Sequence, residues 1–159
     1  MLGAISGAVA GLVAITPACG LVTPGAALAI GAIGGLLAFA AVTWLKMRLR
    51  YDDTLDVFGV HGVAGIWGTV AIGLFLTPEV NTAIQGANPA LYASLGNGTS
   101  SQLLNQVYGV LIACVLAAAG TATILVAIKY TLGLRVTTEQ EIEGLDLSQH
   151  GEEAYNDRD

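Results

Sequence analysis

The 159-residue chain has few charged side chains. Asp, Glu, Lys and Arg together make up 11% of it, whereas they make up roughly a quarter of an ordinary soluble domain. Hydrophobic residues make up 54%, and the mean hydropathy is +0.68. A very apolar soluble core would need polar helix faces, which the long apolar segments of this chain lack. The composition therefore indicates a membrane protein.

Basic residues are absent from the first 45 positions. The six in the chain are Lys46, Arg48, Arg50, Lys129, Arg135 and Arg158. A secretory signal peptide needs a positive charge before its apolar core, so the first apolar segment is not a signal peptide. A nucleic-acid surface would be basic, which excludes that class of partner. Because a first span normally carries cytoplasmic positive charge, we expect that the chain begins partway through a larger membrane protein.

Residues that carry enzyme or metal chemistry are also scarce. The two cysteines, Cys19 and Cys114, lie in apolar segments without ligand spacing, and so predict neither a disulfide framework nor a zinc site. The sequence offers no nucleophile–base pair and no cluster of metal ligands. We therefore predict that the protein is not an enzyme and holds no metal or cofactor.

Four apolar segments dominate the chain, at about residues 2–22, 26–45, 57–76 and 103–132. Their interiors contain no Asp, Glu or Arg, and each reaches or approaches the ~20 residues that a helix needs to cross a bilayer. The predicted fold class is all-α: a polytopic membrane bundle of four transmembrane helices over residues 1–132, part of a larger fold. Residues 133–159 are predicted to form a cytoplasmic tail.

The distribution of charge predicts the orientation. Basic residues follow the second apolar segment and the end of the fourth, while the connections after the first and third contain none. With four alternating spans, both basic regions lie on one side, which the positive-inside rule assigns to the cytoplasm. Both termini are therefore predicted to be cytoplasmic. The predicted tail holds eight acidic and two basic residues, and so accounts for the net charge of −6.

His61 is the one ionisable side chain between residues 57 and 76. Such a side chain is costly in a membrane, faces a bundle interior or a wet cavity, and marks a transport path. The alternative is a neutral histidine that serves helix packing. Asp56 lies about 7–8 Å earlier along a helix, too far for a His–Asp pair. It occupies the position of an N-cap for the third span.

Small residues and helix ends give further local predictions. Gly3, Gly7 and Gly11 form a ridge that lets a second helix approach closely. Pro17 frees a backbone carbonyl one turn earlier, which Thr16 can bond. In the tail, Thr138 and Glu141 match a capping box, and Gly144 marks the end of a short helix.

Three stretches carry a resemblance to a known family. DDTLDVFGVHGV at 52–63 resembles the signature of ammonium transporters of the Amt/MEP family. GAVAGLVAITPACG at 7–20 is similar to another block of that family. GLRV at 133–136, GLDL at 144–147 and HGE at 150–152 resemble its cytoplasmic tail. The motifs stand in the family's order over nearly the whole chain, which would then be a C-terminal fragment covering about the last four spans and the tail.

The resemblance implies a homotrimer whose subunits, of about eleven spans, each contain a pore lined by two touching histidines. His61 matches the second of these histidines. Thr16 matches a residue near the lumen, and Asp56 matches one near the cytoplasmic entrance. The tail resembles a regulatory segment at which nitrogen-signalling proteins of the PII class dock.

Ammonium/ammonia transport for nitrogen uptake, in the plasma (inner) membrane, is thus the predicted function. It would be exercised together with the missing N-terminal spans of the same transporter. Two other readings stay open: a small four-span assembly subunit without transport of its own, and, more remotely, a membrane enzyme. The assembly reading predicts that His61 is dispensable.

Overall fold

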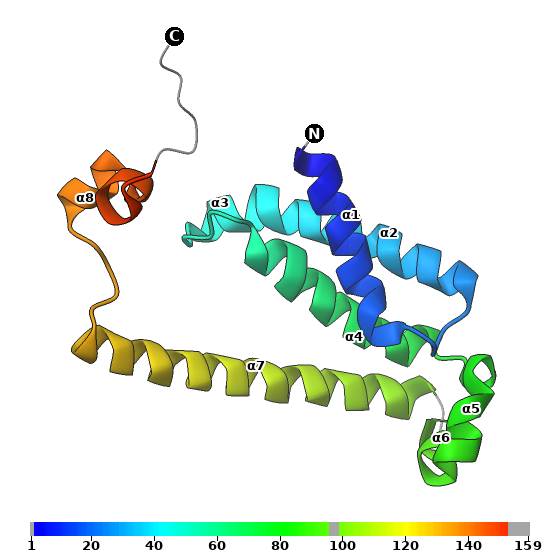
Figure 1. The fold of residues 1–159 in the computed structure, drawn as a ribbon. Coiled ribbons are helices and arrows are strands. Elements are labelled where there is room, and N and C mark those ends of the chain that lie inside the picture. The colour runs from blue at the N-terminus through cyan, green and yellow to red at the C-terminus, as the bar shows by residue number, and fades with distance from the viewer. Residues whose placement is uncertain (1, 96–98, 153–159) are drawn as a thin grey trace. The chain divides into compact units, whose positions relative to one another are not determined.

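The structure is a computed structural model that describes residues 2–95 and 99–152, and these residues form helices and connections without strands. It divides into two compact units, Met1–Ala113 and Cys114–Asp159. Figure 1 shows the helices, coloured from blue at the N-terminus to red at the C-terminus. The elements are α1 Leu2–Ile15, η1 Thr16–Ala18, α2 Pro24–Ala40, η2 Ala41–Leu45, α3 Lys46–Leu49, η3 Phe58–Val63, α4 Ala64–Phe75, η4 Pro78–Asn81, α5 Thr82–Ala87, α6 Pro89–Leu95, α7 Thr99–Thr131, α8 Thr138–Glu143 and η5 Asp146–His150. The predicted all-α membrane fold is confirmed.

Within residues 2–95 and 99–152, three helical stretches are long and apolar enough to cross a membrane: Pro24–Leu49, Phe58–Phe75 and Ser101–Thr131. A shorter apolar helix, Gly3–Ala18, lies within the first predicted span, at 2–22. Pro17 lacks the N–H that would continue the α-helix, so α1 gives way to the 3-10 turn η1. Gly20 then turns the chain with a φ of +76°. That residues 1–132 contain four transmembrane helices stays a prediction.

The second span begins at a proline and ends at a left-handed residue. The Thr23 hydroxyl accepts a hydrogen bond from the Ala26 amide (3.3 Å), and Pro24 occupies the first helical position. The helix continues through η2, where the backbone widens to π geometry, and through α3. It ends at Arg50, whose φ of +53° cannot continue an α-helix.

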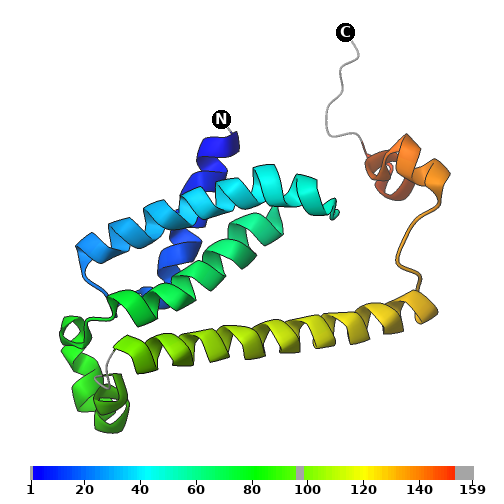
Figure 2. The same ribbon diagram turned by 180° about the vertical axis from the view of Figure 1, so that it is seen from behind.

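Small residues make the packed interior of the first unit, in which α1, α2 and α4 contact one another. Its buried residues include Ala10, Ala14, Ala18, Ile30 and Ala64, none of them exposed to solvent. Gly7 approaches Gly35, and Gly11 approaches Gly31, so α1 and α2 run antiparallel with their backbones close together. The predicted glycine ridge thus packs through Gly7 and Gly11, whereas Gly3 has no such neighbour. Figure 2 shows these helices from behind.

The second unit contains the predicted tail, of which residues 133–152 are described; the predicted tail's last residues, 153–159, lie outside the described part. Helix α8 begins one residue earlier than predicted, because the capping box pairs Thr137 with Gln140 rather than Thr138 with Glu141. Gly144 ends α8 with a φ of +99°, as predicted. The Ser148 hydroxyl then bonds the carbonyls of Gln140 (3.2 Å) and Gly144 (2.9 Å), which links η5 to the end of α8.

Candidate functional site

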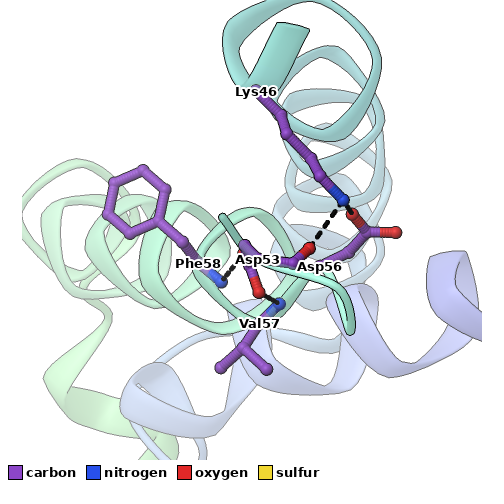
Figure 3. A network of polar contacts seen from close by, with 5 residues as sticks. All are labelled: Lys46, Asp53, Asp56, Val57 and Phe58. Atoms are coloured by element: carbon purple, nitrogen blue, oxygen red, sulfur yellow. Dashed lines mark hydrogen bonds and ion pairs between the residues drawn. The ribbon is translucent and has the colours of Figure 1, made fainter. Parts of the chain in front are cut away.

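The 50–56 segment joins the end of α3 to the helix that carries His61. The Lys46 ammonium lies over this segment and donates two hydrogen bonds of 2.6 Å (Figure 3). One goes to the Asp53 carbonyl oxygen and the other to the Asp56 carboxylate, with which Lys46 forms an ion pair. The two side chains are 28% and 32% exposed, so water screens their attraction only in part.

Asp53, not Asp56, caps the helix that follows. Its two carboxylate oxygens accept hydrogen bonds from the amides of Val57 (2.9 Å) and Phe58 (2.8 Å), as Figure 3 shows. A carboxylate at this end is also favoured by the helix dipole. Asp56 does occupy the position just before the helix, as predicted, but the capping carboxylate is that of Asp53. The side chain of Asp56 instead turns to Lys46, while its carbonyl accepts the bond from the Val60 amide (3.0 Å).

Left-handed backbone bounds the 50–56 segment at both ends. Arg50 has a φ of +53° and Asp56 a φ of +56°, and among the described residues they are the only non-glycine positions with positive φ. Aspartate tolerates this conformation better than most residues, but arginine does not. Such conformations persist only where the surroundings hold them in place.

His61 lies in the π-helical segment η3, Phe58–Val63. π-helical turns are rare and occur frequently at functional sites. The His61 side chain is exposed on the surface of this chain, and none of the hydrogen bonds among the described residues involves its ring. Packing behind the segment is tight, since a Cβ at Gly59 would lie 2.7 Å from the Val42 side chain in η2. The imidazole is therefore presented outward by a closely supported backbone.

Thr16 begins η1 at the end of α1, where α4 packs against it. Its hydroxyl donates to the Leu12 carbonyl at 2.6 Å. The carbonyl that Pro17 leaves without a partner is that of Val13, four residues earlier. Thr16 therefore bonds the carbonyl of the residue before Val13, Leu12. Thr16, His61 and Asp56 make no hydrogen bond with one another in the described part of the chain.

Two hollows lie beside Asp56. The first, of about 250 Å³, reaches from Asp56 and Val60 to Ser6 in α1 and Thr43 in η2. The second, of about 530 Å³, is open and includes Lys46, Arg50 and Tyr51. Asp56 thus lines both hollows, and the second hollow carries basic and acidic side chains together.

Sequence reasoning missed Lys46 and Asp53 as parts of this arrangement. The available signal was the short connection between two antiparallel apolar segments, which returns the acidic residues towards the basic end of the preceding helix. The choice among three neighbouring aspartates depends on the backbone path, which sequence spacing does not provide.

Comparison with known proteins places the chain in a family. The model of the Ammonium Transporter Family matches residues 1–155. The ammonium transporter of Bacillus subtilis is 48% identical over 157 residues, which are 99% of this chain and 37% of that protein. The Aquifex aeolicus ammonium transporter is 46% identical over 156 residues, covering 98% of this chain and 34% of that protein.

A solved structure also resembles the fold. The Sensor Amt Protein superposes with a TM-score of 0.76 at 32% identity, over 92% of this chain and 34% of that one. The described helices are those of an integral membrane protein. The chain belongs to the Ammonium Transporter Family, and it spans about a third of the length of the curated relatives that it matches.

Proposed function

We propose that this chain forms part of a membrane transporter for ammonium/ammonia, in which His61 lines the pore. The family match over residues 1–155 is the observation that carries the proposal. It is supported by the location of His61 on the candidate span Phe58–Phe75, with an exposed ring that bonds no other described residue.

The chemistry of the imidazole suits this substrate. A narrow apolar pore disfavours a bare cation, because removing water from a charge costs several kcal/mol or more. A neutral imidazole both donates and accepts a hydrogen bond, so it can hold ammonia or relay the proton that ammonium gives up. The Thr16 hydroxyl already donates to Leu12, which leaves its oxygen free to accept a hydrogen bond from a substrate N–H. Asp56 is assigned to the cytoplasmic entrance.

The proposal includes the surroundings of the chain. Homotrimer formation, the missing N-terminal spans and a PII-type regulator at the tail follow from the resemblance to the family. Both termini are assigned to the cytoplasm and the protein to the plasma membrane, because the basic residues follow the second and fourth apolar segments.

The test is a chimera in which this chain replaces the matching part of the Bacillus subtilis ammonium transporter. We expect the chimera to take up ammonium, and His61→Ala to change its flux or its selectivity at equal amounts of inserted protein. Ile66→Ala serves as control, because it shortens an exposed side chain of the same helix. An unchanged ammonium flux in His61→Ala would contradict the proposal that this residue lines the pore.

A second candidate is an assembly subunit that does not itself transport. Its support is the apolar stretch Ser101–Thr131, which contains no Asp, Glu, Arg or His and so suits packing against other helices. The same experiment separates the two candidates, because the assembly role predicts that His61→Ala leaves flux unchanged.

A further inference from the structure

The Lys46 ammonium connects two consecutive helices of the first unit. It belongs to α3, at the end of the span Pro24–Leu49, and both of its partners precede the span Phe58–Phe75. Its bond to the Asp53 carbonyl holds the backbone of the 50–56 segment, and its bond to the Asp56 carboxylate holds the last residue before the His61 helix begins. One side chain therefore ties the end of one span to the start of the next.

Asp53 transmits this tie to the helix. Lys46 bonds its backbone carbonyl, while its carboxylate holds the first amides of the next helix, those of Val57 and Phe58. Asp56 acts in parallel, because its carbonyl accepts the bond from Val60, the residue before His61. Two short paths of hydrogen bonds thus lead from Lys46 to the π-helical segment that presents His61.

The backbone of the 50–56 segment needs such a restraint. Arg50 and Asp56 both hold left-handed conformations, which are unfavourable for non-glycine residues and more so for arginine than for aspartate. Without an external partner the segment would relax towards commoner conformations, and the start of the next helix would shift with it. Lys46 lies ten residues from Asp56 and is the partner that the structure provides.

We propose that Lys46 is a positioning residue that sets the place of His61 through Asp53 and Asp56. As far as it concerns transport, this inference rests on the proposed function. Lys46 does not meet the substrate; it acts through the two aspartates. Its loss would loosen the beginning of the His61 helix and displace the imidazole, while the rest of the bundle stays packed.

The first test is hydrogen exchange of the 159-residue chain in lipid nanodiscs. We expect Lys46→Met to speed exchange of the Val57 and Phe58 amides roughly tenfold, about the factor that a hydrogen bond to a charged group contributes. The Leu76 amide, which bonds Ile72 at the other end of the helix, should keep its rate. Arg48→Met is the matched control, because it removes a neighbouring positive charge from α3 that makes no ion pair with Asp56.

Two results would overturn the positioning role: unchanged exchange in Lys46→Met, or an equal change in Arg48→Met. If Lys46→Met does not insert, Asp56→Asn decides, since it removes the ion pair but keeps a polar side chain. It should speed exchange of the same amides, and unchanged rates would count against the proposal. Lys46→Arg should restore much of the protection.

The second test uses the chimera and measures the ratio of ammonium to methylammonium uptake. A simple loss of folded protein would lower both fluxes and leave their ratio unchanged. Displacement of His61 should change the ratio several-fold in Lys46→Met but not in Arg48→Met. An unchanged ratio despite faster exchange would overturn the link to transport. A chimera without any uptake would instead overturn the proposed function, and hydrogen exchange in the chain alone would still decide whether Lys46 holds the helix.

Discussion

The indole nitrogen of Trp67, in α4, donates a hydrogen bond of 2.9 Å to the backbone carbonyl of Ile30, in α2. Ile30 is the largest side chain in the described residues that is fully buried. The bond therefore joins α4 to α2 at a residue whose side chain is fully buried. Trp67 lies six residues after His61 in the chain. Trp67 is half-buried at this interface, where an indole N–H usually finds a partner, so the contact helps to fix how α4 meets α2.

Trp67→Phe should destabilise the first unit. The change keeps an aromatic ring at the interface but removes the donor, and a hydrogen bond of this kind contributes about 1 kcal/mol. A lower midpoint of thermal unfolding in detergent would report the loss. Trp44→Phe provides the control, because Trp44 is 71% exposed and its ring bonds no other described residue. Equal midpoints for the two variants would refute a specific role for the Trp67 bond.

Gly68→Ala should disrupt the approach of α1 to α4. A Cβ at this position would overlap the Ala14 carbonyl oxygen, which belongs to the backbone and cannot move aside as a flexible side chain can. Overpacking of this kind costs typically ~1–3 kcal/mol. Gly65→Ala, one turn earlier in the same helix, meets its nearest atom only at 3.9 Å. The yield of folded monodisperse protein should fall for Gly68→Ala alone; a matching fall for Gly65→Ala would mean that helix glycines are needed for another reason.

Helix α8 should lose a stabilising charge at acid pH. The backbone amide of Glu139, together with the Thr137 hydroxyl, holds the pKa of the Glu139 carboxyl below its ordinary value. Because the folded pKa is the lower one, the stabilisation is present above the ordinary pKa and is lost as the pH falls through the folded pKa. Carboxyl chemical shifts of Glu139, followed by NMR against pH, should give the lowered value.

Glu139→Gln supplies the comparison for this titration. In the unchanged chain, the amide chemical shift of Gln140 should change as the neighbouring Glu139 carboxyl titrates. In Glu139→Gln, whose side chain is neutral, this change with pH should disappear. A Gln140 step that persists in Glu139→Gln would assign the pH dependence of α8 to another carboxylate.

Much of the architecture was predictable from residue types alone. Apolar runs without acidic residues identified the membrane helices, because charge is excluded from lipid along the whole length of a span. Gly144 marked the end of α8, since its left-handed conformation is open chiefly to glycine. His61 stood out because it is the one ionisable residue of its segment, and the motif around it indicated the family that the comparisons confirm. Each of these signals lies within one short segment of the sequence.

Tertiary structure decided the relationships between segments. Pro17 decided where α1 gives way to a 3-10 turn. Of the two aspartates before the next helix, Asp53 supplies the capping carboxylate, while Asp56 holds the left-handed turn. The partners of Lys46 and Trp67 depend on where two helices cross, and that position follows from the sum of small packing contacts. The sequence by itself therefore determined which segments are helical, apolar and related to ammonium transporters. The three-dimensional packing determined which polar groups meet, because a hydrogen bond depends on ångström-level placement that no single residue type encodes.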